Sequence, residues 1–544
     1  MHFSAPMTPY HDLRSFVNDT GRRTVICPKD ERYGYFGGSL LLLPSGPLIY
    51  SCGRIDFERE ENHKVVLASE DRGRSWNEAA IIGRRPGVPK TMRGDSLGLI
   101  DNHRIAMIGN IDSSGFEIRF SSDGGSTWSR PVVAEGKGTV PWGNRAIQTP
   151  EGLLVTTRAP KLGETVRKAV MMSTSSDGGR AWEGPVEIAG DGVKKLTEPS
   201  TTRLQDGRLM TAIRETSYNF YPSYVTFSRD DGKSWSQIRE MPIHGHEICL
   251  GQLNDGRAMV VYRHVGGYAA TLAWAGSPDE RPGYQVPATI RARVPPRITG
   301  DRLVIRTSGR GESVLYHLHP PESMESTIRI DAELRCLNNA RNACGIHVAQ
   351  AGWVAFYPDR VELPDCGGME VQLDSSVYRS YTITRTGDYL SVYEGGRELL
   401  RTDRLNMGRE VEVDYGTILP NNVNAFGTQT PFMADLECES AGESHWRSLR
   451  IEIDNPGNRR HLHCWEASSG FVPNQYEEDR MVMIEDNYGG SVYLLGQASW
   501  VQFPDGVILV STGLQYLRED GKRSSWIRGC YLGEDDLPPK IFEK

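Results

Sequence analysis

Short apolar segments separated by polar turns recur along the first half of the chain. The first pair is Gly38–Leu43 and Leu48–Ser51, and it continues toward Arg54. Two apolar segments joined by a tight turn are typical of a β-hairpin. In each later copy the second segment also ends near an arginine or asparagine, and a further strand follows that leads into an Asp-containing turn. The pattern therefore predicts a repeated unit of four antiparallel strands.

The turn that follows the third strand is the clearest signal of the repeat. Ser121–Trp128 reads Ser-Ser-Asp-Gly-Gly-Ser-Thr-Trp, and three relatives share its spacing: Ser69–Trp76, Ser175–Trp182 and Ser228–Trp235. Asp and Ser side chains bond nearby backbone N–H groups in such turns, and Gly supplies a positive φ. We expect the aspartates to form turns and the tryptophans to join the apolar core. A fifth copy has decayed to Ser277-Pro278-Asp279.

The period breaks between about Pro282 and Asp454. Within this segment Ser326–Leu334 and Arg379–Arg385 alternate apolar and polar residues, as strands with one buried face do. The segment resembles a concanavalin-like β-sandwich and is interpreted as an insertion. The repeated unit returns at Ser491–Gln497.

These patterns predict an all-β protein, a six-bladed β-propeller with an inserted β-sandwich (jelly-roll) domain. The predicted divisions are residues 1–284 for blades one to five, 285–455 for the sandwich, and 456–544 for blade six and ring closure. The isolated strand Thr24–Cys27 is expected to complete the last blade, because a closed ring leaves no sheet edge exposed.

Composition narrows the choice of partners. The 544 residues are 38% hydrophobic with 58 glycines, which suits a turn-rich β protein with an ample core. The net charge of -8, spread without long runs, disfavours a nucleic-acid or membrane partner. Nine scattered cysteines predict no disulfide framework. Since the N-terminus lacks the apolar region of a signal peptide, a cytoplasmic location is expected, although a trimmed secreted form would look the same. The oligomeric state stays open.

The Asp-turn-Trp repeats on a six-blade plan resemble the Asp-boxes, or BNR repeats, of the sialidase (neuraminidase) superfamily. The resemblance covers the propeller, about two-thirds of the chain, and the insertion resembles the lectin-like (LamG-like) modules of several members. It implies a sialidase-type propeller and a glycan or oligosaccharide ligand. The same repeat occurs in glycosidases, other polysaccharide-acting enzymes and pure binders, so the chemistry must come from the site.

Residues at the entrances of the inner strands of a propeller converge on one axial pocket. Counting eight residues back and eight forward from the inner Asp-Gly turns of blades four and five gives two matching pairs, Glu198 with Arg214 and Glu247 with Arg263. The same count back in blade six gives Gln497. The pocket is therefore expected to be polar and charged.

The resemblance implies that Glu198 and Arg214 correspond to the family's catalytic glutamate and one arginine of its triad. It also implies a tyrosine nucleophile where Gln497 stands, and a first arginine near Phe36–Gly38. Both are missing, and both serve a sugar with a carboxylate on its anomeric carbon. We therefore expect Glu198 and Glu247 to act as a carboxylate pair, one as general acid and the other as nucleophile or base. Structural ion pairs with the arginines are the alternative.

Further residues are expected at the same pocket. Glu61, or its neighbour Glu60, in the acidic loop after Arg54 is a candidate replacement acid/base, and Asp95 is a further catalytic candidate. The candidate substrate contacts, besides those above, are Arg54, Arg93, Trp142, Asn144, Arg145, Arg158 and Tyr262. Each of these residues also has a structural interpretation. Asp95 and Arg93 would cap a turn. Arg54 and Arg158 would lie at solvated strand ends, and Trp142 and Tyr262 would pack in the core.

The sequence thus favours an exo-acting glycoside hydrolase that cleaves a terminal, acidic sugar. A polysaccharide lyase acting on a uronate, with a Tyr or His as base, and a non-catalytic carbohydrate-binding protein are the alternatives. His244-Gly245-His246 and His461-Leu462-His463-Cys464 contain metal-ligand side chains but lack the second half of a known spacing. No metal and no nucleotide cofactor are expected.

Overall fold

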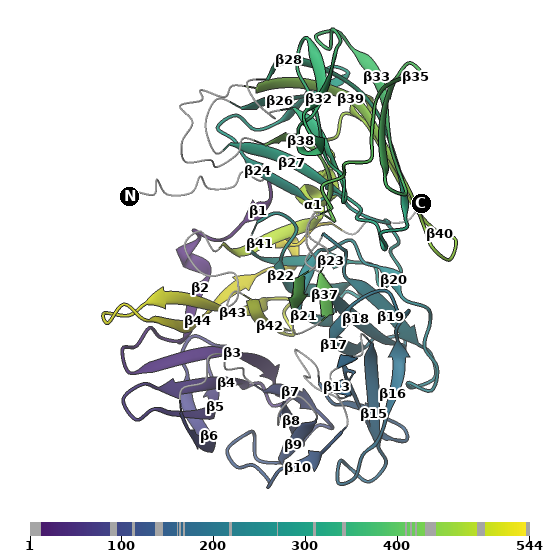
Figure 1. Ribbon diagram of the computed structural model, residues 1–544. Helices are drawn as coiled ribbons and strands as arrows, with labels where there is room; N and C mark the ends of the chain where they lie inside the picture. Colours follow the sequence, from purple (N-terminus) through teal and green to yellow (C-terminus); the bar gives the residue numbers. More distant parts are fainter. Residues whose placement is uncertain are drawn as a thin grey trace.

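Six β-sheets arranged in a ring form a β-propeller, shown in the lower part of Figure 1. The computed structural model describes residues 12–87, 95–110, 115–136, 145–159, 161–162, 165–166, 169–216, 220–268, 270–307, 312–339, 344–407, 411–413, 416–418, 422–429, 442–486 and 496–539. The six-bladed all-β prediction is confirmed.

The first three blades follow one another along the chain. Blade one consists of β3 (Tyr33–Leu42), β4 (Leu48–Asp56), β5 (Glu61–Ser69) and β6 (Asn77–Pro86). Blade two consists of β7 (Ser96–Leu99), β8 (Ile105–Asn110), β9 (Phe116–Ser121) and β10 (Val132–Ala134). Blade three consists of β11 (Ile147–Thr149), β12 (Gly152–Arg158), β15 (Val170–Ser175) and β16 (Glu183–Ala189), with a small hairpin of β13 (Lys161–Leu162) and β14 (Thr165–Val166) between its middle strands.

The last three blades take strands from both ends of the chain. Blade four consists of β17 (Leu196–Arg203), β18 (Leu209–Glu215), β19 (Tyr224–Ser228) and β20 (Arg239–Glu240). Blade five consists of β21 (Gly245–Gln252), β22 (Ala258–His264), β23 (Ala270–Gly276) and β41 (Met481–Asp486), with β1 (Arg14–Ser15) added in parallel at its edge. Blade six consists of β42 (Gly496–Gln502), β43 (Ile508–Leu517), β44 (Arg523–Leu532) and β2 (Arg23–Cys27).

The middle strands are apolar on both faces because each blade is covered by its neighbours. Leu48, Ile49 and Tyr50 of β4 are all at most 1% exposed, and all seven residues of β22 are buried. Burial on both faces produces continuous apolar runs, whereas a strand with one solvated face alternates. This explains the uninterrupted apolar segments that define the repeat in the sequence.

The N-terminal strand closes the ring as predicted. β2 runs antiparallel to β44, with Arg23 opposite Cys530. Glu485 of β41 reinforces this closure, because its carboxylate accepts hydrogen bonds from Arg23 Nη1 at 2.6 Å and from Arg528 Nε at 2.5 Å. Segments from the two ends of the chain are thus joined by strand pairing and by a shared ion pair.

Blade five differs from the prediction at its outer strand. The predicted division placed residues 456–544 in blade six, but β40 (Arg459–Glu466) pairs with β39 (Gly442–Asn455) outside the propeller, and β41 pairs with β23. The fifth copy of the signature turn has decayed, so no local hairpin supplies a fourth strand there. The chain instead returns to blade five about 200 residues later.

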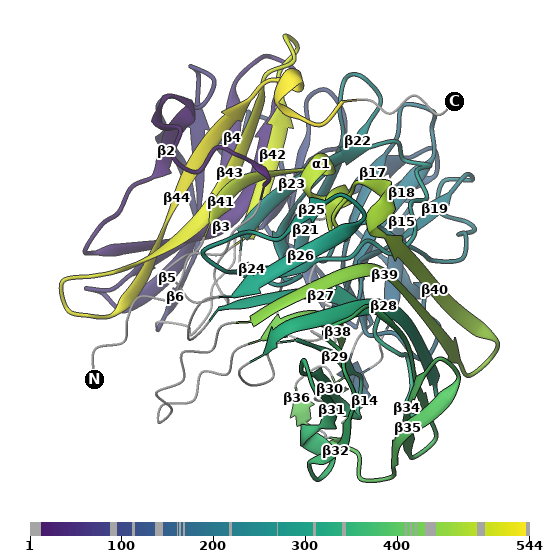
Figure 2. The ribbon, with the colours of Figure 1, turned by 90° about the horizontal axis from the view of Figure 1, so that it is seen from above.

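Two further sheets lie above the propeller in Figure 1 and side by side in Figure 2, and we call them the two-sheet body. The seven-stranded sheet has the order β24 (Ala288–Arg291), β27 (Ser313–Leu318), β38 (Asn424–Gln429), β29 (Gly345–Val348), β30 (Gly352–Phe356), β31 (Arg360–Leu363), β32 (Met369–Gln372). The eight-stranded sheet has the order β25 (Arg297–Thr299), β26 (Arg302–Thr307), β39, β28 (Thr327–Asn339), β33 (Arg379–Thr386), β34 (Tyr389–Glu394), β35 (Arg397–Thr402), with β40 on β39.

One apolar core joins the two sheets of this body. Its buried members come from both, among them Tyr316 and Phe426 of the first sheet and Trp446 of the second. Outside the sheets lie a small hairpin of β36 (Val411–Val413) and β37 (Gly416–Ile418), the helix α1 (Gln475–Arg480), and 3₁₀ turns at Thr20–Arg22, Pro364–Cys366, Ala467–Ser469 and Glu534–Asp536. The concanavalin-like assignment and the division at residue 284 remain predictions.

The four signature turns have one common set of hydrogen bonds. In Ser121–Trp128, the Ser121 hydroxyl donates to Asp123 at 2.9 Å, the Gly125 N–H donates to Ser121 at 2.9 Å, and Trp128 Nε1 donates to the Gly125 carbonyl at 2.8 Å. The same three bonds recur in the other copies. The aspartates therefore form the turns, and each tryptophan is fixed against the blade core.

The signature aspartates are expected to make stability fall in acid. Hydrogen bonds from Ser75 and Ser69 lower the pKa of Asp71 to about 2, and the pKa values of Asp123, Asp177 and Asp230 are lowered in the same way. An unfolded aspartate has a pKa of about 3.9, so this stabilisation is present above pH 4 and is lost as the pH falls toward 2. Melting temperatures of the wild type and Asp71→Asn, measured from pH 5 to 2, should converge in acid. Parallel curves would contradict this origin of the pH dependence.

Candidate functional site

Three inner strands carry a residue in the left-handed conformation at the same register. Glu198 of β17, Glu247 of β21 and Gln497 of β42 have φ values of 47°, 52° and 44°. Each sits at a β-bulge, where the pairing with the second strand of its blade shifts. Non-glycine residues in this region cost of order 1–3 kcal/mol and gather at functional sites. The alignment of these three positions by counting is thus reproduced in three dimensions.

Blade one has glycines at the equivalent bulge, which lies between Phe36 and Ser39. A Cβ added to Gly37 would overlap Gln497, and a Cβ added to Gly38 would overlap the Ser51 carbonyl oxygen. Gln497 of blade six at Gly37, and the backbone of the neighbouring strand β4 at Gly38, therefore leave no room for a side chain here. This is a physical reason why the arginine that the family resemblance implies is missing.

The two glutamates are buried ion-pair partners of the predicted arginines. Glu198 and Glu247 are 6% and 5% exposed. Arg214 Nη1 lies 2.6 Å from Glu198 Oε1, and Arg263 Nη1 lies 3.4 Å from Glu247 Oε1. Each arginine comes from the second strand of the same blade, β18 or β22, so each blade brings one carboxylate and one guanidinium together.

The second oxygen of each carboxylate reaches the following blade. Glu198 Oε2 accepts the Glu247 N–H at 3.4 Å, and Glu247 Oε2 accepts the Gln497 N–H at 2.8 Å. Two residues further along, the hydroxyls of Ser200 and Ser499 accept backbone N–H groups from the next blade, both at 3.0 Å. Blades four, five and six are therefore connected at the candidate site by side chains that accept backbone N–H groups.

His246 lies between the two ion pairs, and sequence reasoning considered it only as a metal ligand. Its Nδ1 is 3.3 Å from Arg263 Nη2 and the ring is 2% exposed. Burial, together with the charges of Arg214 and Arg263, holds its pKa well below the usual value, so the ring is neutral at pH 7. Its place directly before Glu247 was the signal that it belongs to this site.

The catalytic candidates Asp95 and Glu61 and the predicted substrate contact Arg54 lie in blades one and two. Asp95 is buried and accepts a hydrogen bond from Lys64 Nζ at 2.6 Å. Burial raises the pKa of its carboxyl group. Arg54 contacts His63 and Glu78, each at 2.6 Å. Glu61 is half-buried at the start of β5. Asp95 with Lys64, and Arg54 with His63 and Glu78, are thus two separate sets of polar contacts in blades one and two.

The remaining predicted substrate contacts divide into three groups. Arg145 is half-buried beside Gly98 of the inner strand β7, and Arg158 ends β12. Tyr262 is fully buried with its hydroxyl 2.6 Å from Met481 Sδ, so it is a core residue and we leave it out of the candidate site. Arg93, Trp142 and Asn144 lie outside the described residues.

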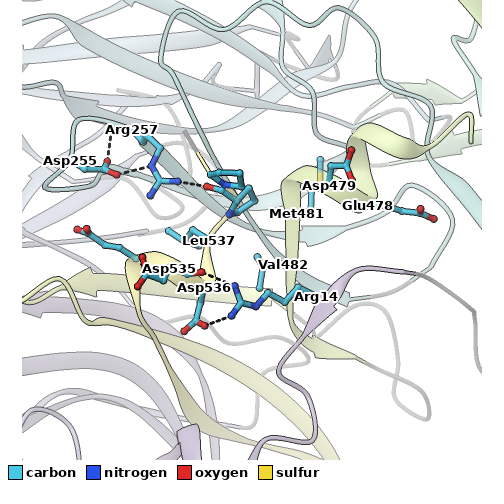
Figure 3. A pocket seen from close by; sticks show the side chains of 13 residues that line it. Arg14, Asp255, Arg257, Glu478, Asp479, Met481, Val482, Asp535, Asp536 and Leu537 are labelled. Carbon is cyan, nitrogen blue, oxygen red and sulfur yellow. Dashed lines mark hydrogen bonds and ion pairs between the residues drawn. The ribbon is translucent and has the colours of Figure 1, made fainter. Parts of the chain in front are cut away.

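Figure 3 shows the residues that line a cavity of about 520 Å³, among them Asp255 and Arg257. These two residues follow the C-terminal end of β21, whereas Glu247 lies near its N-terminal end. The two arginines that line the cavity form hydrogen bonds with acidic residues that also line it. Arg257 Nε donates to Asp255 at 2.8 Å, and Arg14 Nη2 donates to Asp536 at 2.6 Å. None of the residues at the bulges lines it. This cavity is separate from the candidate site.

Glu477→Gln is expected to raise the melting temperature at pH 8 and to change it little at pH 4. Glu477 lies on α1, accepts from the Tyr268 hydroxyl at 3.0 Å, and burial raises its pKa to about 8. An unfolded glutamate has a pKa of about 4.3, so the folded state retains a proton and loses stability as the pH rises between these values. Calorimetry from pH 4 to 9 tests this. An equal shift at both ends of the range would contradict it.

Comparisons with known proteins agree with the architecture. Residues 57–294 match the family model described as a BNR repeat-like domain. Its four Asp-turn-Trp hairpins and six sheets give the chain the architecture of a six-bladed β-propeller with BNR-type repeats. No curated protein sequence matches the chain.

Several solved structures are similar at low identity. A protein of unknown function from Dyadobacter fermentans is 16% identical, with 55% of this chain and 94% of that chain covered and a TM-score of 0.37. Trypanosoma rangeli sialidase is 10% identical, with 87% of this chain and 98% of that chain covered and a TM-score of 0.33. Penicillium chrysogenum alpha-L-arabinanase, complexed with arabinobiose, is 13% identical, with 53% of this chain and 93% of that chain covered and a TM-score of 0.33. The strand pairing and the signature hairpins define the fold.

Among the described residues, no helix has the length and apolarity needed to cross a membrane. The eight described cysteines are all in the free thiol form, and only Cys464 among them is exposed.

Proposed function

We propose that the protein is a glycoside hydrolase with Glu198 and Glu247 as its reacting carboxylates. The observation that carries this proposal is the repeated geometry of blades four and five. Each blade holds a glutamate in a strained left-handed bulge and an arginine against its carboxylate. A pair of carboxylates is what most glycoside hydrolases use, and strain retained at a buried polar site points to function.

The two ion pairs suggest a division of roles. Glu198 has the shorter contact with its arginine, 2.6 Å against 3.4 Å, and an adjacent guanidinium favours the ionised carboxylate. We assign Glu198 as the nucleophile or base at the anomeric carbon. Glu247 is assigned as the general acid that protonates the leaving glycosidic oxygen.

The arginines bear on the choice of sugar. A guanidinium has five N–H donors and binds carboxylates through paired hydrogen bonds. Arg214 and Arg263 stand beside the two glutamates, and Arg145 lies at the inner strand of blade two. Although Arg214 and Arg263 are each paired with a glutamate, these three guanidinium groups are the donors that would bind the carboxylate of a terminal, acidic sugar in exo-type cleavage.

A second candidate function is carbohydrate binding without chemistry. Both oxygens of each glutamate already accept hydrogen bonds from protein groups, and this arrangement also serves to join neighbouring blades. A purely structural role for the pair would leave the propeller as a lectin.

A glycan panel separates these functions. The full-length protein is incubated with neutral and acidic oligosaccharides, and reducing ends and absorbance in the unsaturated-uronate band are followed. We expect reducing ends to rise without absorbance, and acidic substrates to be preferred. A rise in absorbance would indicate a lyase instead, and binding with neither signal would overturn the catalytic proposal.

A further inference from the structure

Three side chains from separate segments meet where blade four contacts the two-sheet body. Glu240 comes from β20, His319 follows β27 directly, and His461 comes from β40. Their potential ligand atoms all lie within 4.8 Å of one another. Two imidazoles and a carboxylate are a ligand set that zinc and related divalent ions take in proteins.

The hydrogen bonds of His319 fix the state of its ring. Its Nδ1 is 2.7 Å from the Pro320 carbonyl oxygen, which can only accept, so Nδ1 carries a proton. Its Nε2 is 2.8 Å from Glu240 Oε1. With Nδ1 protonated, Nε2 of a neutral ring directs its lone pair toward Glu240, which is the position that a bound cation would occupy.

His461 has a corresponding arrangement. Its Nε2 is 3.3 Å from Glu322 Oε1, and its Nδ1 is 3.7 Å from Glu240 Oε1. Lys194 and Arg459 hold Glu322 at 3.0 Å and 2.5 Å, so the charge of this carboxylate is compensated. Glu322 is thus suited to orient His461 through Nε2 and leave Nδ1 toward Glu240.

Metal-binding histidines typically donate their second ring N–H to a carbonyl or carboxylate, and both histidines here have such an acceptor. The rings of His319 and His461 are stacked with centroids 3.6 Å apart, an arrangement unfavourable for two imidazolium ions. One divalent ion would satisfy both lone pairs and the carboxylate together, after the ring of His461 turns toward it.

A cavity of about 700 Å³ gives access to the cluster. Glu240, Glu322 and His461 line it, together with residues of blades three and four. A ligand position beyond the three protein atoms can therefore be filled by water from this cavity.

We propose that Glu240, His319 and His461 form a binding site for a divalent transition-metal ion such as Zn²⁺, with Pro320 and Glu322 orienting the two rings. The ion joins blade four to the two-sheet body and stabilises the folded chain, because the three ligands come together only after folding. This replaces the expectation from the sequence, in which His461 lacked a partner spacing and no metal was predicted. The site is independent of the proposed hydrolase activity.

The test measures metal binding directly. The full-length protein is stripped with EDTA and titrated with ZnCl₂ by calorimetry, and Co²⁺ is added separately to look for the visible absorption of a His-ligated ion. We expect one equivalent of Zn²⁺ to bind and to raise the melting temperature. No zinc binding by the folded wild type would overturn the proposal.

Variants locate the site on these residues. His461→Ala and Glu240→Gln should abolish zinc binding, and Glu322→Gln should weaken it about 10- to 100-fold, as loss of an orienting partner does. His445→Ala is the matched control, because His445 Nε2 contacts Glu443 at 2.9 Å in a histidine–carboxylate pair elsewhere in the two-sheet body. Equal loss of binding in His445→Ala, or full binding in His461→Ala, would contradict the assignment.

Discussion

Replacing Glu198 or Glu247 by glutamine is expected to reduce kcat on the cleaved glycan by about 10²- to 10⁴-fold, the range that a positioned acid or base contributes. Glutamine preserves the shape of the side chain and removes its charge and proton. Initial rates at saturating substrate provide the measurement. Because kcat reports the bound complex, loss of sugar affinity alone would appear in KM instead.

The stability of these two variants must be measured beside their activity. Glu198 is buried 2.6 Å from Arg214, and breaking a buried ion pair costs about 3–5 kcal/mol. We therefore expect a lower melting temperature, and kcat is to be expressed per folded molecule. Glu477→Gln is the matched control, since it changes a buried glutamate on α1 and should keep the wild-type kcat. Wild-type kcat in either Glu198→Gln or Glu247→Gln would disprove the carboxylate-pair mechanism.

Glu485→Leu is expected to lower the free energy of unfolding by about 3–5 kcal/mol, the cost of breaking a buried ion pair. Glu485 is 1% exposed and its carboxylate holds Arg23 of β2 and Arg528 of β44. Loss of this carboxylate leaves two guanidinium groups facing an apolar side chain at the point where the ring closes. Urea denaturation followed by fluorescence measures the change.

An exposed ion pair provides the comparison for this second prediction. Arg72 and Asp505 form a bidentate pair between blades one and six at 2.9 Å and 2.8 Å, and both side chains are about half exposed. Solvent screening limits such pairs to less than about 1 kcal/mol, so Asp505→Asn should have a small effect. Similar losses in Asp505→Asn and Glu485→Leu would show that Glu485 has no special part in ring closure.

The blades were predictable from the sequence because their signals are local. All the hydrogen bonds that define a signature turn lie within the eight residues from Ser121 to Trp128. The outer strand of blade five had no such signal. β41 pairs with β23 across about 200 residues, and the decayed turn at residues 277–279 gave no indication of where the fourth strand would come from.

The candidate site was predictable in register but not in its contacts. Counting from the inner turns aligned Glu198, Glu247 and Gln497, because the bulge falls at the same point of each strand. The bonds from each carboxylate to the next blade depend on how the blades pack, which no local pattern encodes. The same holds for Gly37, whose lack of a side chain is explained only by the close approach of Gln497.

The cluster around His319 shows the same limit. His461 was recognised as a possible ligand, but Glu240 and His319 are distant in the sequence and come together only when blade four meets the two-sheet body. Long-range contacts of this kind give no spacing that a sequence motif can report.

The most direct test of the account is a crystal structure of Glu247→Gln soaked with the oligosaccharide that the wild type cleaves. The account predicts intact sugar with its scissile glycosidic oxygen within hydrogen-bonding distance of residue 247 and its anomeric carbon facing Glu198. Sugar bound only elsewhere, with the bulges of blades four and five untouched, would contradict it.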